Sequence, residues 1–382
     1  MSTSSPLSAA SFMSERVAFS DAGDGLEECF DWVVSNQLGD GLPVIPPTEE
    51  RVTRMLAGYP GDPQQEIAQI PPSWSPATLE KIAICAVMAG CRPEYMPVVV
   101  AGVEAMTDPS VNLYGLQATT GYGAPSLIVN GPVAQDLDIN SNTGAFGPGW
   151  RANATIGRAI KQICIAVGGG IAGVTDRSTF GWPGKYGFCF AENEDASPWE
   201  PLHVERGFAA HDSTVMVAGV NSILTLLVGA MTGKDTLVRL ADSLIHCAGA
   251  MAGHLATVGV GGGDPILVLG MDDASVIGRD GYTKQDVKEY LYEHVTLPID
   301  HVPIDPQREE GMPERGLAQI MSETPNVTPD GKVHRTDKPD DLIILVAGGT
   351  GPHSALLPMW MGRITRPAIR QIRWTPFSER SE

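Results

Sequence analysis

Short apolar runs that end in glycine recur five times along this sequence. They are rich in Val, Ile and Leu and span residues 98–102, 127–131, 215–219, 266–270 and 344–348. Continuous runs of this kind are typical of strands covered on both faces, and a glycine at the exit lets the chain turn sharply. A helix-like segment follows each run. The pattern of five strand–Gly–helix units predicts an α/β fold, with one or more parallel or mixed sheets and helices on the faces.

Helices are also indicated by capping residues and by apolar residues at helical spacing. Ser75 suits an N-cap and Pro76 the first helical position, which predicts a helix from there to about Gly90. Similar patterns predict helices at 153–167, 234–251 and 283–291. The very apolar window 215–231 contains polar residues and is short for a membrane span, so we expect a buried strand followed by a buried helix.

Long Pro- and Gly-rich loops, at 39–48, 144–150, 171–206 and 298–339, separate these elements. The loop at 298–339 is polar, rich in proline and without periodicity, as in a linker, a lid or an arm that embraces a partner. The sequence thus predicts a flexible N-terminus at 1–20, a main α/β domain at 21–297, a Pro-rich arm or linker at 298–339, and a C-terminal strand–helix element at 340–376 that packs on the main domain.

The charge and cysteine pattern limits the partners and the compartment. The formal net charge is −19 and no basic cluster stands out, so we expect neither nucleic acid nor a membrane surface as a partner. The six cysteines form no CxxC pair, and the N-terminus lacks a basic region followed by an apolar stretch. These features predict a cytoplasmic protein with reduced thiols.

The loop from Ser178 to Phe208 concentrates reactive side chains between two regular regions, where rigid scaffolds commonly carry sites. Carboxylates and a histidine here are candidates for proton transfer: Glu192, Glu194, His203 and Glu205. Candidate substrate contacts are Lys185, Tyr186, Asn193 and Arg206. Cys189 is a candidate nucleophile or, between two phenylalanines, a buried inert thiol. The alternative for the whole loop is that its aromatic residues fill a core and its charges face solvent.

A metal is possible in the same loop. If this segment were a strand, His203 and Glu205 would share one face and form a two-ligand fragment. A metal site needs three or four ligands, and no second His/Cys cluster with metal-ligand spacing accompanies the fragment.

Two glycine-rich segments are further candidates. Residues 144–155 lead into a predicted helix, where backbone N–H groups with Arg151, Asn153 and the nearby Asn142 would hold an anion; an ordinary turn is the alternative. Residues 348–354 lack the spacing and the lysine of a P-loop, so no ATP is expected. His353 and Ser354 nevertheless follow a predicted strand, where open α/β sheets place their sites.

Residues 259–263 form a glycine-rich segment that precedes a predicted strand instead of following one. A dinucleotide fingerprint requires the opposite order, so neither NAD nor FAD is expected.

Four segments, at residues 40–48, 146–153, 188–206 and 349–360, together resemble a bacterial family associated with UGSC-motif (seleno)proteins. The resemblance spans roughly residues 25–370. This chain has no UGSC or CGSC sequence of its own. The resemblance therefore implies that a separate subunit supplies the reactive sulfur or selenium, while this chain supplies substrate binding and acid–base groups.

Three functions follow as hypotheses. The first is an enzyme subunit that performs thiol-assisted carbon–heteroatom bond chemistry on a small, anionic molecule with a partner subunit. The second is a self-sufficient hydrolase or hydro-lyase that uses Cys189 or a metal at His203 and Glu205. The third is a non-catalytic binding or scaffolding subunit. In each case the glycine-flanked elements and low aromatic content favour a homo- or hetero-oligomer.

Overall fold

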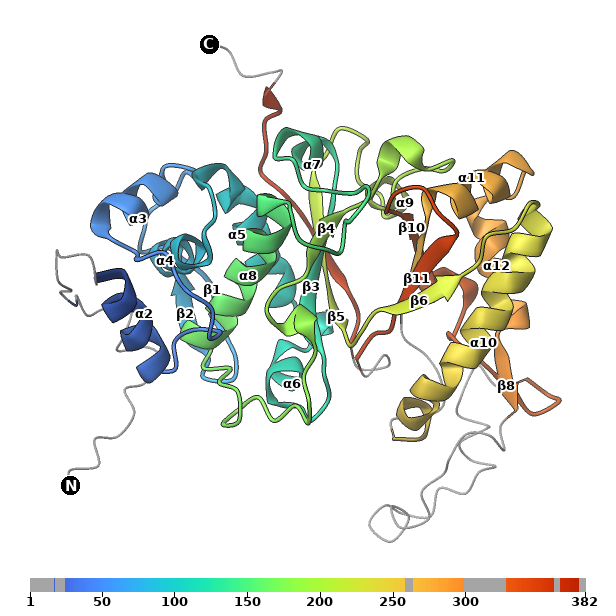
Figure 1. Ribbon diagram of the computed structural model, residues 1–382, viewed down its shortest axis with the longest axis horizontal. Helices are drawn as coiled ribbons and strands as arrows, with labels where there is room; N and C mark the ends of the chain where they lie inside the picture. The colour runs from blue at the N-terminus through green and yellow to red at the C-terminus, as the bar shows by residue number, and fades with distance from the viewer. Residues whose placement is uncertain (1–16, 18–24, 258–263, 299–327, 361–364, 378–382) are drawn as a thin grey trace, which may run out of the picture.

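The structure is a computed structural model that describes residue 17 and residues 25–257, 264–298, 328–360 and 365–377, the side chains of 247–257 excepted. Most of the predicted flexible N-terminus, 1–20, lies outside the described residues. The expected α/β class is confirmed: two mixed four-stranded sheets stand at the centre, with helices at both ends (Figure 1).

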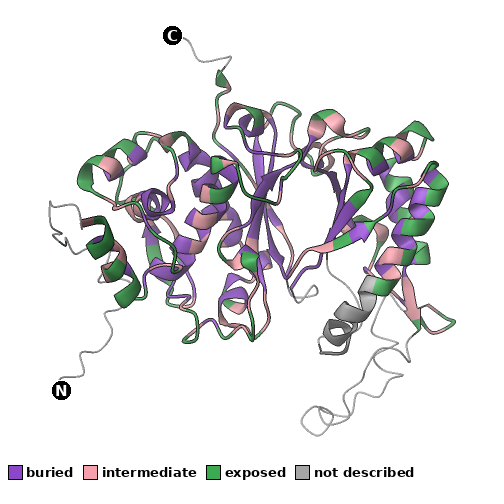
Figure 2. Ribbon diagram, viewed as in Figure 1, coloured by how far each residue is buried: buried purple, intermediate pink, exposed green. Residues whose placement is uncertain are grey.

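The first sheet has the order β12-β5-β3-β4. Its strands are β3 (Ala124–Asn130), β4 (Cys189–Ala191), β5 (Thr214–Val220) and β12 (Ala368–Gln371). Strands β3 and β4 are parallel, whereas β5 runs antiparallel to both β3 and β12. Every residue of β5 is buried, as the continuous apolar run predicts for a strand covered on both faces (Figure 2).

The second sheet has the order β10-β7-β11-β6. Its strands are β6 (Leu224–Leu227), β7 (Ile266–Leu269), β10 (Ile343–Val346) and β11 (His353–Leu357). Strands β7 and β10 are parallel, and β11 is antiparallel to β7 and β6. Two smaller antiparallel pairs complete the described strands, β1 (Glu66–Ile70) with β2 (Ser75–Thr78) and β8 (Thr296–Pro298) with β9 (Lys332–His334).

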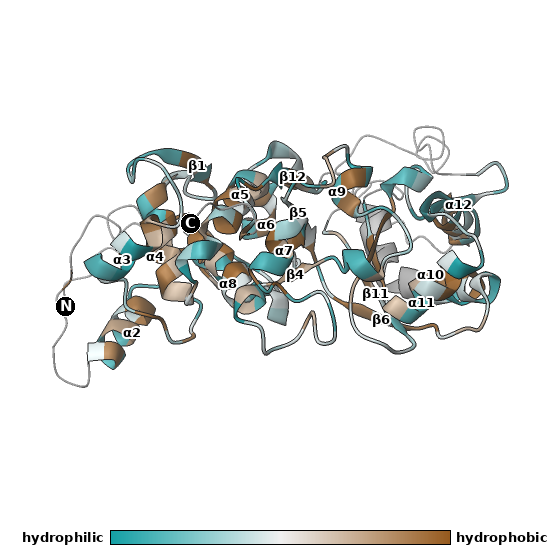
Figure 3. Cartoon of the chain, turned by 90° about the horizontal axis from the view of Figure 1, so that it is seen from above, coloured by the Kyte–Doolittle hydropathy of each residue, from teal (hydrophilic) through white to brown (hydrophobic). Residues whose placement is uncertain are grey.

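The helices divide between the two ends of the molecule (Figure 3). Those on the side of the first sheet are α2 (Gly25–Ser35), α3 (Glu49–Leu56), α4 (Leu79–Ala89), α5 (Met96–Met106), α6 (Leu113–Ala118), α7 (Pro132–Asp136) and α8 (Arg151–Ala166). The remaining helices are α9 (Leu202–Glu205), α10 (Gly233–Thr257), α11 (Met271–Arg279) and α12 (Lys284–His294). Helix α4 ends as expected at Gly90, with φ of 91°, and α12 begins as expected after Thr283, which forms a capping box; the residue that caps α4 is Thr78.

Three apolar cores separate four layers. The first lies between the first sheet and helices such as α4, α5 and α8, and the second lies between the second sheet and α10, α11 and α12. The third core lies between the two sheets and joins residues such as Ile128 and Met216 to Val268 and Leu345. Burial of both faces of both sheets explains why their strands read as unbroken apolar runs.

Both sheets share one strand pattern, and they exchange their last strands. In each, a strand, its parallel neighbour and an antiparallel strand follow in chain order: β3, β4, β5 in the first and β7, β10, β11 in the second. The chain then crosses to the other sheet, since β6 follows β5 but pairs with β11, and β12 follows β11 but pairs with β5. The crossing point is the bridge between Val220 and Met359.

Several predicted elements are wrong. The run 98–102 belongs to helix α5, which begins beside Pro97 and is buried nearly all round, and an apolar run alone does not distinguish such a helix from a buried strand. The predicted helix after the 215–219 run is strand β6, held by pairing with β11. Residues Ser75–Thr78 form β2, so the predicted helix begins three residues later than expected, at Leu79.

The C-terminal part of the chain also differs from the expectation. The described residues of 340–376 contribute three strands and no α-helix after the first strand. Two of these strands belong to the second sheet and one to the first. Residues 299–327 of the predicted arm lie outside the described residues, and its first residue, Pro298, pairs with Lys332 of β9. No helix in the described part of the chain is long and apolar enough to cross a membrane.

Candidate functional site

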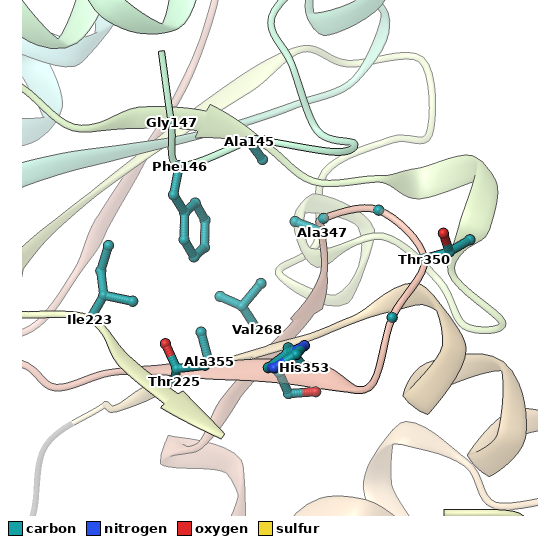
Figure 4. A pocket seen from close by; sticks show the side chains of 15 residues that line it. Ala145, Phe146, Gly147, Ile223, Thr225, Val268, Ala347, Thr350, His353 and Ala355 are labelled. Atoms are coloured by element: carbon teal, nitrogen blue, oxygen red, sulfur yellow. The ribbon is translucent and has the colours of Figure 1, made fainter. Parts of the chain in front are cut away.

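A pocket of about 320 Å³ lies against the inner face of the second sheet (Figure 4). A row of residues from three neighbouring strands lines it, because Thr225 on β6 pairs with Ala355 on β11 and Ala355 pairs with Val268 on β7. Phe146, from the loop at 144–147, also lines the pocket, and its ring packs edge-on against Phe190 with centroids 4.7 Å apart. The pocket is therefore mainly apolar, with one hydroxyl group in this row.

The rim of the pocket is the glycine-rich loop after β10. The Gly348 N–H donates to the Ser141 carbonyl at 2.8 Å, which seats the loop against the first half of the chain. Gly349 lies so close to Thr143 that a Cβ there would be 2.0 Å from the Thr143 Oγ1. Only glycine fits this approach.

Two successive residues of this loop that line the pocket, Gly349 and Thr350, have amides that are unpaired among the described residues. Within the described part of the chain, the N–H groups of Gly349 and Thr350 donate no hydrogen bond, whereas the next amide, Gly351, donates to the Asp272 Oδ2 at 2.9 Å. Consecutive backbone N–H groups in a turn attract oxygen atoms that carry negative charge. The rim thus offers donors above an apolar floor.

His353 begins β11 and lines the pocket with an exposed side chain, as Figure 4 shows. Ser354 faces the opposite side of the sheet, where its hydroxyl donates to the Asp273 Oδ2 at 2.7 Å and accepts from the Gly270 N–H at 3.1 Å. Of this predicted pair, His353 presents its side chain to the pocket, while the side chain of Ser354 is buried in a hydrogen-bond network.

A second polar cluster lies at the carboxyl ends of the parallel strands β3 and β4. Asn130 donates from its Nδ2 to the Glu192 Oε2 at 2.6 Å and to the Glu194 Oε1 at 3.0 Å. The Leu202 N–H also donates to the Glu192 Oε2, at 2.8 Å. The structure therefore brings together two of the predicted acid–base residues.

Burial dominates the electrostatics of this cluster. It raises the pKa of Glu192 to about 7, against the attraction of Lys284, and the Glu192 Oε1 has no hydrogen-bond partner among the described residues. His203 is 1 % exposed, and neither ring nitrogen has a hydrogen-bond partner among the same residues. Its Nδ1 lies 3.7 Å from the Glu194 Oε1. The cluster thus holds a carboxyl group of raised pKa and an imidazole without hydrogen bonds to the described residues inside the fold.

Asn193 links the buried cluster to the loops around the pocket. Its Nδ2 donates to the Asn142 Oδ1 at 2.8 Å, and its backbone N–H donates to the Val346 carbonyl at 2.7 Å. Asn142 lies two residues before the loop at 144–147, and Val346 ends the strand that leads into the rim. Asn142 and Asn193, predicted separately as substrate contacts, thus bond each other, and Asn193 connects them to the second sheet beside the pocket.

Glu205 forms ion pairs with two buried lysines. Its carboxylate lies 2.9 Å from the Lys284 Nζ and 2.5 Å from the Lys288 Nζ. Burial alone would raise its pKa, but the two lysines lower it overall. Because 202–205 is helix α9 instead of a strand, His203 and Glu205 do not form the predicted two-ligand face. Among the described residues no group of three His, Cys, Asp or Glu side chains is placed to hold a metal ion.

Other predicted residues lie apart from the pocket lining. Cys189 is buried in β4, and burial raises the pKa of its thiol, which opposes a role as nucleophile. Lys185 is paired with Asp176 at 2.6 Å. Tyr186 is exposed, and so is Arg206, which follows α9.

The predicted anion site at the start of α8 is not supported. Arg151 donates from Nε and Nη2 to the carbonyl of Gly90, at 3.0 and 2.9 Å, so its guanidinium caps the end of α4. Asn153 is buried and bonds the backbone of Asn140 and Ala145. The alternative, an ordinary glycine-rich turn, describes these residues better, although Asn153 supports the loop that carries Phe146.

The sequence alone did not single out Thr225, Asp272 or Asp273. Thr225 sits in a run that local pattern assigned to a helix, and the two aspartates are ordinary first-turn residues of α11. Strand pairing brings Thr225 to the pocket, and the two aspartates bond the segment that carries His353. No protein-family model matches the chain, and no curated protein does either.

Proposed function

We propose that this chain is an enzyme subunit that transforms a small molecule bound in the pocket beside His353. The observation that carries the proposal is the position of an exposed imidazole next to two free loop amides at the edge of an apolar floor. Histidine is the side chain best suited to exchange protons near neutral pH. The amides of Gly349 and Thr350 would hold an oxygen of the substrate, which favours a carboxylate or carbonyl compound.

A thiol-assisted reaction would take its sulfur from a partner subunit. The five cysteines whose side chains are described are all buried, and none of them lines the pocket. Burial raises the pKa of Cys85 and Cys91 to about 12, which suppresses the reactive thiolate. Lyase- or hydrolase-type chemistry at the pocket, with proton transfer by His353, is consistent with this arrangement.

The test begins with a screen of small carboxylic and carbonyl compounds by thermal shift, with and without an added thiol. Turnover of the compounds that bind is then compared between the wild type and His353→Gln, with His211→Gln as the control because His211 is exposed and lies outside the pocket lining. We expect His353→Gln to lose at least about 100-fold in kcat with an unchanged unfolding temperature. Equal turnover in both variants would rule out the role of His353.

A further inference from the structure

The segment that carries His353 is held on both sides by consecutive residues of α11. Two residues before the histidine, the Gly351 N–H donates to the Asp272 Oδ2 at 2.9 Å. One residue after it, the Ser354 hydroxyl donates to the Asp273 Oδ2 at 2.7 Å. The first turn of one helix therefore fixes both flanks of the proposed proton-transfer group.

Asp273 ties this segment to two further loops. It is 2 % exposed, and its Oδ1 accepts from the Gly229 N–H at 3.2 Å. Ser354, which donates to the other oxygen, also accepts from the Gly270 N–H at 3.1 Å. The network thus joins the end of β7, the start of β11 and the turn after β6, the three strands whose residues form the pocket floor.

The polarity of this network matches a carboxylate. Both oxygens of Asp273 accept hydrogen bonds, and the Ser354 hydroxyl is the donor to one of them because a carboxylate has no proton to give. An amide at position 273 would remove one of the two acceptors, so that an NH2 group would face either the Gly229 N–H or Ser354, whose hydroxyl already accepts from Gly270. Burial raises the pKa of Asp273, and the hydrogen bonds from Ser354 and Gly229 offset only part of the cost of burying this carboxylate.

We infer that Asp273 is a positioning residue, which acts through Ser354 to set where His353 stands at the pocket, with Asp272 holding the preceding turn. The alternation of a strand supports this arrangement, because neighbouring side chains of β11 point to opposite faces. Ser354 is therefore anchored on the helix side of the sheet while His353 faces the pocket. The inference rests on the proposed function of the pocket.

The test uses the full chain and the NMR signals of the His353 ring, assigned with His353→Gln. Asp273→Asn and Ser354→Ala are expected to shift or broaden these signals, and to lower kcat at least about tenfold with little change in KM. Asp280→Asn is the matched control, since Asp280 follows the same helix and also accepts from a backbone amide, that of Gly233 at the start of α10, at 2.6 Å. This control should leave both readouts unchanged.

Ser354→Ala removes only the hydroxyl link, so it decides the question if Asp273→Asn fails to fold. Wild-type ring signals in folded Ser354→Ala would overturn the inference. The NMR readout needs no substrate, and it can therefore fail while His353→Gln still abolishes turnover. Conversely, perturbed ring signals without any effect of His353→Gln on turnover would refute the proposed function alone.

Discussion

Glu192 is a buried side chain whose ionisation opposes the fold. Burial raises its pKa to about 7, whereas the carboxyl group of an exposed glutamate has a pKa near 4.5. The folded protein therefore binds this proton more tightly than the unfolded chain does. The resulting stabilisation is fully present below pH about 4.5, and it is lost as the pH rises towards 7. The shift corresponds to about 3 kcal/mol.

Glu192→Gln removes this titration. We expect the variant to gain unfolding free energy relative to the wild type when the pH is raised from 5 to 8, by up to about 3 kcal/mol. Urea unfolding at both pH values measures the gain, with the exposed Glu293 replaced by Gln as the control. If the wild type and Glu192→Gln show the same change between pH 5 and pH 8, the carboxyl group does not titrate as described.

At the level of single residues, the sequence predicts which side chains have suitable chemistry for a site. Whether such a side chain is available to a ligand depends on its hydrogen-bond and ion-pair partners in the fold. His353 was recognised from its place after an apolar run, and it lines the pocket. Arg151 and Glu205 have equally suitable chemistry, but the carbonyl of Gly90 and two buried lysines occupy them. Those partners lie 61, 79 and 83 positions away in the chain, beyond what local spacing can reveal.

At the level of secondary structure, the backbones of helix α8 and of the segment before β4 come into close contact at two glycines, Gly157 and Gly187. A Cβ on Gly157 would lie 2.8 Å from the Phe188 N, and a Cβ on Gly187 would lie 2.4 Å from the Arg158 N. Two backbones can come this close only where both contacting positions lack a side chain. The contact brings Phe188 and Phe190 to the core beside Phe146, and thus supports one wall of the pocket.

Gly157→Ala tests that contact, because two effects change the unfolding free energy in opposite directions. Helix propensity alone predicts that alanine in the middle of α8 raises the unfolding free energy by about 1 kcal/mol. We expect a loss of about 1–3 kcal/mol instead, since the new methyl group meets the backbone of Phe188. Ala154→Gly, at an exposed position of the same helix, should cost about 1 kcal/mol by propensity. A stabilised Gly157→Ala in thermal unfolding would contradict the close approach.

At the same scale, the sequence predicted four of the five apolar runs as strands correctly, because burial on both faces requires continuous apolar residues. The fifth, at 98–102, failed because a fully buried helix has the same composition as a buried strand. Strands β6, β11 and β12 were not recognised as strands. They are 4 or 5 residues long, and partners far away in the chain determine their conformation.

In the molecule as a whole, the exchange of β6 and β12 makes each sheet depend on both halves of the chain. The second sheet takes its edge strand β6 from the part of the chain that directly follows β5 of the first sheet, and that strand contributes Thr225 to the pocket. The first sheet takes β12 from the part that follows β11 of the second sheet. The pocket consequently combines Phe146 and Thr225, which belong to the segment up to β6, with His353, which belongs to the segment after it.

This exchange predicts that the described layers unfold together, although many chains of this length unfold domain by domain. Val99→Ala lies in the core between the first sheet and its helices, and Ile344→Ala lies in the core beyond the second sheet. Each substitution removes buried methyl groups and should cost about 1–4 kcal/mol. Because the exchanged strands couple the sheets, we expect either variant to lower hydrogen-exchange protection in both β3 and β7. Loss of protection confined to β7 and β10 in Ile344→Ala would mean that the second sheet opens by itself, and the pocket would then lose its floor without unfolding of the first sheet.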